Sequence, residues 1–226
     1  MSDAEQPATA KAVISQTFST PVARIPCPYA DEINGPLTEL VLARLDPLYK
    51  RLGYKSETPD DLTRWGDPVA DRLSRWVVRM ARQFTEAVTG RSLEASFAAS
   101  MTRERGDVPS EADSRSVRIA VSRSWASVYR KGDRHEPHFH PNTALAAVYY
   151  VTAPESCEID LLDPRPAVDY YDPGISLAGD GHRVRMSCSP GELLLFPGWL
   201  KHGVPEFQDG SVRISVSWNL NYAVVH

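Results

Sequence analysis

The sequence lacks the features that mark several large classes of protein. It has no run of about 18 consecutive apolar residues and no cluster of basic residues, and its formal net charge is −4. Such a chain offers no transmembrane helix and no general electrostatic attraction to phosphate backbones or anionic lipids. The first residues also lack a basic segment followed by an apolar run. We therefore expect a cytoplasmic protein with no nucleic-acid or membrane partner.

Cysteine is scarce, since the chain has only Cys27, Cys157 and Cys188. An odd number of cysteines at wide spacing predicts neither a disulfide framework nor a Cys-x-x-Cys metal site, so we expect reduced thiols. What the chain does have is an ordinary globular composition over 226 residues, with 42% hydrophobic and 24% charged residues. This length can bury one sizeable core. We expect residues 1–13 to be disordered and residues 14–226 to form one domain.

The first half of this domain, residues 14–116, is expected to supply an N-terminal strand and supporting helices. The stretch "ISQTFSTPVARIPCP" fits an edge strand interrupted by proline. Apolar spacing predicts a first helix over residues 36–53, with a late kink or break at Pro47. A second helix is predicted over residues 68–90, with Asp67 as its N-terminal cap. The residues on the predicted core face of the second helix are Leu73, Trp76, Val77, Met80, Phe84 and Val88.

From residue 117 onward, short apolar or alternating runs are separated by turn residues, as in "TALAAVYYV", "GELLLFP" and "SVRISVSWNLNY". This pattern predicts an all-β sandwich or barrel over residues 117–226. Within it, residues 163–190 are rich in proline, glycine and aspartate. Segments of this length inside a compact domain are often lids, so we expect a substrate lid here. A surface excursion that carries a short hairpin is the alternative.

Three of the six histidines lie within the stretch "HEPHFHP", residues 135–141. Side chains two residues apart on a strand share a face, so His138 and His140 can bind one divalent ion. His135 lies three residues before His138 and is expected to point away. His202 follows the apolar run "GELLLFP" and the turn "PGW", where it offers a third ligand. The alternative is a surface cluster of histidines that binds no metal.

The strand predicted over residues 212–219 alternates in an unusual way. One face carries apolar residues and the other carries four polar ones, which are Arg213, Ser215, Ser217 and Asn219. An arginine followed by a serine two residues later can bind a carboxylate, because the guanidinium gives a two-pronged hydrogen bond and the hydroxyl a third. The alternative is a polar face turned to solvent.

These motifs resemble the Fe(II)- and 2-oxoglutarate-dependent oxygenases. The stretch "YRKGDRHEPHFHP" is similar to their Y-x-x-G…H-x-D segment, with His140 where the aspartate usually stands. The stretch "PGELLLFPGWLKHGV" resembles the strand that leads to their distal histidine, here His202. "RISVSWN" matches their Arg-x-Ser motif. A small subgroup of the family also shares "F-x-T-P" at residues 18–21, "W-x-x-x-Y-x-x-G-D" at 125–133 and "D-P-R" at 163–165.

The resemblance implies a double-stranded β-helix, or jelly roll, of roughly eight strands with flanking α-helices. It implies an enzyme that uses Fe(II), 2-oxoglutarate and O2 to hydroxylate an unactivated C–H bond, with release of succinate and CO2. The expected Fe(II) ligands are His138, His140 and His202. Arg213 and Ser215 are expected to bind the far carboxylate of 2-oxoglutarate, and Tyr129 its C1 end.

Several assignments within this resemblance have alternatives. Glu136 is the main alternative to His140 as third ligand, while Asp160 and Asp163 are more distant ones. Halogenation is disfavoured, because family halogenases carry a small residue where His140 stands. The substrate is expected to be an amino acid, a peptide or a natural-product intermediate. Candidate substrate residues are Arg134, Trp199 and Asn219, and Arg123 and Arg165 are further candidates for meeting an acidic group.

Two other classes of protein fit the same sequence. One is a cupin-like metal-dependent dioxygenase or isomerase that shares the barrel and the three histidines but does not use 2-oxoglutarate and does not require Arg213. The other is a non-catalytic β-sandwich binding module without a metal. For any of them, a homodimer is an open alternative to a monomer.

Overall fold

The structure is a computed structural model that describes residues 17–46, 54–105, 116–165 and 182–224, with side chains omitted for 101–105. The predictions for residues 1–13 and for a break at Pro47 lie outside these ranges. Among the described helices, none is long and apolar enough to cross a membrane.

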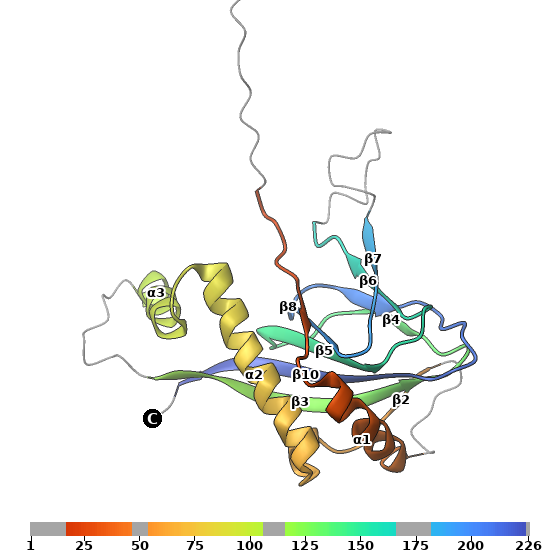
Figure 1. Cartoon of the computed structure of the whole chain (residues 1–226). Coiled ribbons are helices and arrows are strands. Elements are labelled where there is room, and N and C mark those ends of the chain that lie inside the picture. Colours follow the sequence, from red (N-terminus) through yellow and green to blue (C-terminus); the bar gives the residue numbers. More distant parts are fainter. Residues whose placement is uncertain (1–16, 47–53, 106–115, 166–181, 225–226) are drawn as a thin grey trace, which may run out of the picture.

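Two antiparallel sheets form the body of the protein (Figure 1). The larger sheet has the strand order β1-β8-β5-β10-β3-β2, and the smaller sheet has the order β4-β9-β6-β7. This arrangement, with helices on one side, confirms the predicted jelly-roll core. The strands are β1 (Ala23–Pro26), β2 (Ser56–Glu57), β3 (Val117–Tyr129), β4 (His135–His138), β5 (Leu145–Thr152), β6 (Glu158–Leu162), β7 (Arg183–Ser187), β8 (Glu192–Pro197), β9 (His202–Val204) and β10 (Arg213–Val224). The predicted edge strand is β1, which is shorter than its sequence pattern suggested.

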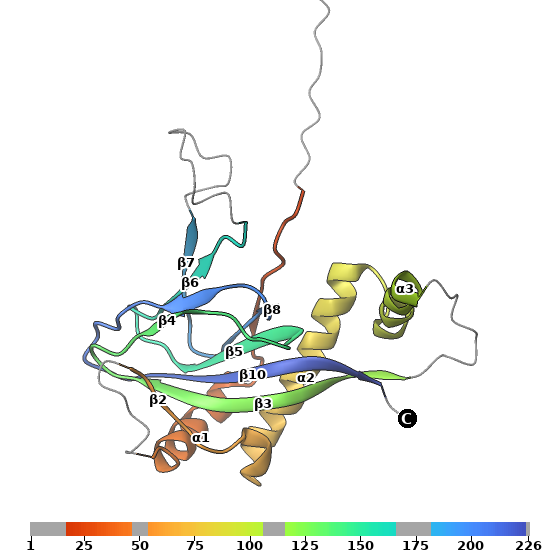
Figure 2. The same ribbon diagram turned by 180° about the vertical axis from the view of Figure 1, so that it is seen from behind.

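The helices α1 (Ala30–Ala43) and α2 (Pro68–Thr89) cover the outer face of the larger sheet, as Figures 1 and 2 show. α2 matches its prediction at both ends. The Asp67 carboxylate accepts hydrogen bonds from the amides of residues 69 and 70, and Gly90 ends the helix with a φ of 65°. Glycine is favoured at this φ because it has no Cβ that would clash with the backbone.

The prediction for the first helix was wrong about its start, because α1 begins at Ala30 and contains Pro36 in its interior. It ends at Ala43, before Pro47. The core face of α2 was predicted correctly except at its end. Leu73, Trp76 and Val77 are buried, and Met80 and Phe84 pack against the same core. Val88, however, is 53% exposed, because the buried face continues through Ala81 and Thr85.

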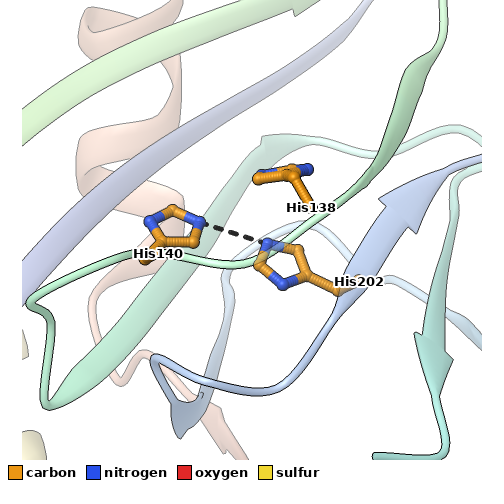
Figure 3. A group of neighbouring side chains, drawn as sticks. All are labelled: His138, His140 and His202. Atoms are coloured by element: carbon orange, nitrogen blue, oxygen red, sulfur yellow. Dashed lines mark hydrogen bonds between the residues drawn. The ribbon is translucent and has the colours of Figure 1, made fainter.

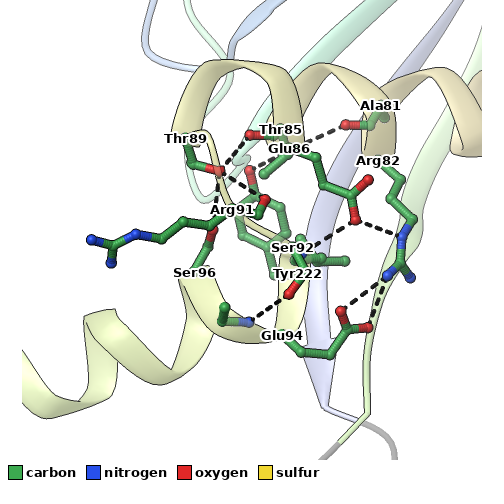
Figure 4. A network of polar contacts seen from close by, with 12 residues as sticks. Ala81, Arg82, Thr85, Glu86, Thr89, Arg91, Ser92, Glu94, Ser96 and Tyr222 are labelled. Carbon is green, nitrogen blue, oxygen red and sulfur yellow. Dashed lines mark hydrogen bonds and ion pairs between the residues drawn. The ribbon is translucent and has the colours of Figure 1, made fainter.

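Two helical elements were not predicted: the short 3₁₀ helix Leu62–Arg64 and α3 (Leu93–Arg105). Figure 4 shows how α3 is attached to α2. Arg82 pairs with Glu86 on its own helix and with Glu94 on α3, at 3.0 Å in each case. The Thr85 hydroxyl also lies 3.2 Å from the Tyr222 hydroxyl on β10, which ties this end of α2 to the sheet.

Strand β10 separates the two interiors of the protein. Its even-numbered residues Ile214, Val216, Trp218 and Leu220 belong to the core under the helices. Its odd-numbered residues face the opposite way, toward the smaller sheet, because strand side chains alternate. A second apolar cluster, which includes Tyr150, Ile159 and Phe196, fills part of the space between the sheets.

The segment 163–190, expected to be a lid, contains β7 at residues 183–187, which pairs with β6. Residues 166–181 lie outside the described ranges, so the lid stays a prediction. The pairing also brings Cys157 and Cys188 together, because the Cys188 amide donates to the Cys157 carbonyl at 2.9 Å. All three cysteines are free and buried, as expected.

Gly198 lies in the turn after β8, and its backbone is hydrogen-bonded to two residues of the segment between β4 and β5. Its carbonyl accepts from the His140 amide at 2.9 Å, and its own amide donates to the Ala144 carbonyl at 3.1 Å. A Cβ at Gly198 would meet the Thr143 carbonyl oxygen at 2.2 Å. Only glycine fits so close an approach of two backbone segments.

We predict that Gly198→Ala lowers the free energy of unfolding by about 2 kcal/mol or more, since the clash is with backbone and cannot be relieved by a rotamer change. Gly210→Ala is the matched control, because a Cβ there meets nothing within 4 Å. Denaturant unfolding of both variants measures the difference. Equal stability of the two variants would contradict this account of the turn.

Candidate active site

His138, His140 and His202 converge on one point between the sheets (Figure 3). His138 ends β4 and pairs directly with His202 on β9, while His140 follows β4 by two residues. One nitrogen from each imidazole lies within 4.8 Å of the other two. The predicted His-x-His pair and the distant third histidine are therefore brought together, as the sequence spacing indicated.

Each of these three imidazoles contacts an oxygen through Nδ1. The acceptors are the Leu200 carbonyl for His202 at 2.8 Å, the Glu136 carbonyl for His138 at 2.9 Å and the Asn219 side-chain oxygen for His140 at 2.5 Å. Because these oxygens only accept, each Nδ1 must carry the proton and donate. Each Nε2 is then left with a free lone pair.

The Nε2 atoms of His140 and His202 lie 3.3 Å apart. With both protons on Nδ1, no hydrogen lies between them, so two lone pairs face each other. A cation between the nitrogens removes this repulsion. The donor set therefore fits a divalent metal, with the oxygen acceptors fixing each ring as such contacts do in metal sites.

Burial keeps the three imidazoles neutral. It lowers the pKa of His202 to about 3, and it is also the largest cause of the lowered pKa values of His138 and His140. The charged form loses more hydration than the neutral form when a ring is enclosed. At neutral pH all three nitrogens are available to a metal.

The prediction for His135 was wrong, because its ring lies against the His138 ring, with centroids 3.8 Å apart, and lines the same cavity. The reason is an irregularity in β4. His135 pairs with Val204 and His138 with His202, so three steps on β4 match two on β9. A bulge of this kind brings residues of odd spacing to one side. His135 is nevertheless not part of the cluster of three nitrogens.

The carboxylates considered as third ligand lie elsewhere. Glu136 is exposed and pairs with Arg134 at 2.8 Å. Asp160 pairs with Arg185 at 2.7 Å and with Arg183 at 3.3 Å, and Asp163 pairs with Arg165. None of these three acids belongs to the cavity lining. Their positions favour His140.

The polar face of β10 turns inward, so the solvent-facing alternative was wrong. Arg213 is 2% exposed and Ser215 is 3% exposed, and both line the cavity that contains the histidines. The Arg213 Nη1 donates to the Glu158 carbonyl at 2.9 Å, while its Nε has no partner. Among the described residues no carboxylate pairs with Arg213. A buried guanidinium with no acidic partner favours a bound anion.

Tyr129 lies at the Arg213 end of the cavity. The Arg213 guanidinium carbon is 4.7 Å from the centre of the Tyr129 ring. This position differs from the expected contact with the C1 end of 2-oxoglutarate, because Tyr129 is directly opposite Arg213 in the pairing of β3 with β10.

Sequence reasoning missed Lys55 as a cavity residue. Its side chain is 6% exposed, lies over the Tyr129 ring at 5.9 Å and pairs with Glu57 at 2.8 Å. Lys55 immediately precedes β2, whose Ser56 pairs with Val128 of β3. No local pattern near residue 55 indicates that pairing. Lys55, Tyr129 and Arg213 thus form a row across neighbouring strands.

The candidate substrate residues have other contacts. Asn219 orients His140 through the hydrogen bond described above, Trp199 is 53% exposed and outside the cavity lining, and Arg134 pairs with Glu136. Trp125, the first residue of the motif at 125–133, was not among the candidate site residues but lines the cavity. Its ring stacks on His140 with centroids 5.8 Å apart and planes 19° apart.

The jelly roll brings together three convergent imidazoles and a buried guanidinium that has no carboxylate partner among the described residues. Residues 123–219 match a family model described as "Putative 2OG-Fe(II) oxygenase". No curated protein matches the chain in sequence. The family match, the fold and the histidine motif together support a 2-oxoglutarate- and Fe(II)-dependent oxygenase, and Fe(II) and 2-oxoglutarate are the cofactors that fit this site.

Solved structures show the same fold at low sequence identity. The α-ketoglutarate-dependent epimerase SnoN from nogalamycin biosynthesis is 13% identical, with a TM-score of 0.59 over 91% of this chain and 78% of that one. A Pseudomonas putida prolyl-4-hydroxylase is 13% identical, with a TM-score of 0.51 over 88% and 92%. HygX from Streptomyces hygroscopicus, solved with nickel, 2-oxoglutarate and hygromycin B, is 14% identical, with a TM-score of 0.51 over 91% and 84%.

We predict that the metal-free protein loses stability as the pH falls below about 6.5, the ordinary imidazole value. The unfolded chain then binds protons that the folded cavity excludes, since the pKa of His135 is lowered to about 2 and that of His202 to about 3, mainly by burial. Thermal unfolding between pH 7 and 4 measures the loss. His135→Phe should make the decline shallower; a slope identical to that of the unmodified protein would refute this.

Proposed function

We propose that this oxygenase hydroxylates an unactivated C–H bond of a small molecule, namely an amino acid, a peptide or a natural-product intermediate, in the cytoplasm. One observation carries the proposal. The same cavity contains three imidazole nitrogens that can bind a metal and the guanidinium of Arg213, which has no carboxylate partner among the described residues. A cupin-like enzyme without 2-oxoglutarate would have no use for that guanidinium.

In this proposal His138, His140 and His202 hold Fe(II) through Nε2, and the three oxygen acceptors keep their rings in place. When bound together, Fe(II) and 2-oxoglutarate supply C–H oxidation by dioxygen, with 2-oxoglutarate converted to succinate and CO2. Arg213 and Ser215 bind the far carboxylate of 2-oxoglutarate, and Tyr129 covers the guanidinium. The buried site excludes bulk water, which strengthens the interaction of a carboxylate with Arg213.

Hydroxylation is proposed as the default outcome of this chemistry. Halogenation is disfavoured, because His140 fills the position that a halide would need. The fold also occurs in SnoN, named as an epimerase, and in a prolyl-4-hydroxylase, so the fold itself is compatible with both reactions. Product analysis distinguishes them, since hydroxylation adds one oxygen atom to the substrate and epimerisation leaves its mass unchanged.

The deciding experiment is an anaerobic titration of the metal-free protein with Fe(II) and then with 2-oxoglutarate. We expect the visible absorption band of a metal-chelated 2-oxo acid to appear in the second step. Metal binding without the band would favour the cupin-like alternative. Binding of neither would favour a non-catalytic module.

The third ligand is tested by substitution. His140→Ala should lose most of the bound iron, because two imidazoles remain, whereas His140→Asp should retain it by restoring a carboxylate ligand. Glu136→Ala is the matched control, four residues before His140, and should keep full iron. Metal analysis after dialysis measures all three; iron retained in His140→Ala and lost in Glu136→Ala would show that the ligand is Glu136.

Arg213 is tested through the cosubstrate. Arg213→Leu should weaken 2-oxoglutarate binding about 100-fold, since a buried charged contact is worth roughly 2–5 kcal/mol, and should retain Fe(II). Binding of 2-oxopentanoate, which lacks the far carboxylate, should change much less. Titration of the absorption band with both acids gives the two ratios. An equal loss for both acids would mean that Arg213 does not bind the far carboxylate.

A further inference from the structure

The structure distinguishes between the three arginines that were candidates for meeting an acidic substrate group. Arg134 donates to Glu136 at 2.8 Å, and Arg165 pairs with Asp163. No hydrogen bond or ion pair joins the Arg123 side chain to any other described residue. Its guanidinium carbon lies 5.0 Å from the centre of the Trp125 ring. Within the described part of the chain, Arg123 is therefore the one of these three arginines without an acidic partner.

Arg123 shares a strand face with the cavity residues Trp125, Ser127 and Tyr129, since these alternate along β3. In the pairing with β10, Arg123 is opposite Asn219 and Tyr129 is opposite Arg213. The two arginines are therefore roughly 20 Å apart along the strands. Arg213 is buried and lines the cavity, whereas Arg123 is exposed and lies just outside the lining, two residues before the lining residue Trp125. We take this end of the cavity as its mouth.

The mouth lies beside the proposed metal site. The ring of Trp125 carries Arg123 on one side and contacts His140 in a stacked arrangement. A substrate held by Arg123 would thus approach the histidines from the end that 2-oxoglutarate, bound at Arg213, leaves open.

The charges of the cavity favour an anion. Its lining contains Lys55, Arg213 and four histidines whose neutral form is favoured by burial, and it contains no carboxylate. Glu57 neutralises Lys55. The three proposed ligands are neutral, so they leave the double positive charge of Fe(II) unchanged. The two negative charges of 2-oxoglutarate balance the iron, and the positive charge of Arg213 remains. A negative substrate is therefore attracted to the cavity and a positive one is repelled.

The Trp125 indole offers a second donor near Arg123. Its Nε1 is buried and forms no hydrogen bond with the described residues. A buried N–H without an acceptor is costly, and a ligand oxygen would satisfy it. A planar guanidinium over the same ring adds a charged donor, and such a guanidinium matches a carboxylate better than a neutral group.

We propose that the primary substrate carries a carboxylate, and that Arg123, held over the Trp125 ring, binds it at the mouth of the cavity. The inference rests on the proposed function, because it takes the Arg213 end to be occupied by 2-oxoglutarate. It narrows the substrate class to small acids with an apolar part next to the acid group.

The test uses matched probes and the protein loaded with Zn(II) and 2-oxoglutarate, so that no turnover occurs. Dissociation constants of phenylacetate and phenylacetamide, and of hexanoate and hexanamide, are measured by ligand-observed NMR. We expect each acid to bind about tenfold more tightly than its amide, which corresponds to about 1.4 kcal/mol for one charge-assisted contact. The preference should vanish in Arg123→Gln and return in part in Arg123→Lys.

Arg118→Gln is the matched control, because Arg118 is exposed on the same strand but pairs with Ala223, away from the cavity. It should keep the full preference for acids. Equal binding of acid and amide by the wild type, or a preference that Arg123→Gln retains, would overturn the proposal. If phenyl phosphate bound more tightly than phenylacetate, the proposed acid group of the substrate would be a phosphate rather than a carboxylate. The Fe(II) absorption band reports separately on the proposed function: its absence contradicts that function, whereas its presence without acid preference contradicts only the role of Arg123.

Discussion

The site depends on strand β10 having two faces with opposite requirements. One face packs Val216 and Trp218 into the core under the helices, where burial of apolar surface holds the strand in place. The opposite face carries Arg213 and Ser215 into the cavity. A shift of one residue would bury the guanidinium among apolar side chains and turn tryptophan into the cavity, so the register of the core also fixes the register of the site.

The histidines are positioned by pairing in the smaller sheet and by backbone contacts to the larger one. His138 and His202 face each other across β4 and β9, and the His140 amide is held by the Gly198 carbonyl. Asn219, from the same face of β10 as Arg213, orients the His140 ring. The metal end and the anion end of the cavity are therefore connected through one strand, which favours a fixed spacing between the two ends.

The sequence predicted those parts of the protein that follow from local periodicity. The all-β sandwich or barrel, the ends of α2 and the polar stripe of β10 depend on alternation, helical spacing and end signals that can be recognised within one segment. The jelly roll in particular was implied by the resemblance to the oxygenases. His135 was misplaced because a bulge breaks the period of two on which its orientation was judged. Lys55 was missed because its place depends on β2 pairing with β3, about seventy residues away in the chain. The start of α1 was missed because Pro36 usually marks a first turn and here lies within the helix.

In the proposed site a third imidazole takes the place of the usual carboxylate, and this has a consequence for metal selectivity. Nitrogen donors bind divalent ions in the order Fe(II) below Co(II), Ni(II) and Cu(II), with Zn(II) also above Fe(II). A carboxylate ligand moderates this order by adding a hard, charged oxygen. With three neutral nitrogens, the proposed site has a stronger intrinsic preference for nickel, copper and zinc than a two-histidine site does. Occupation by iron then depends on which metals the cell makes available rather than on the ligands alone.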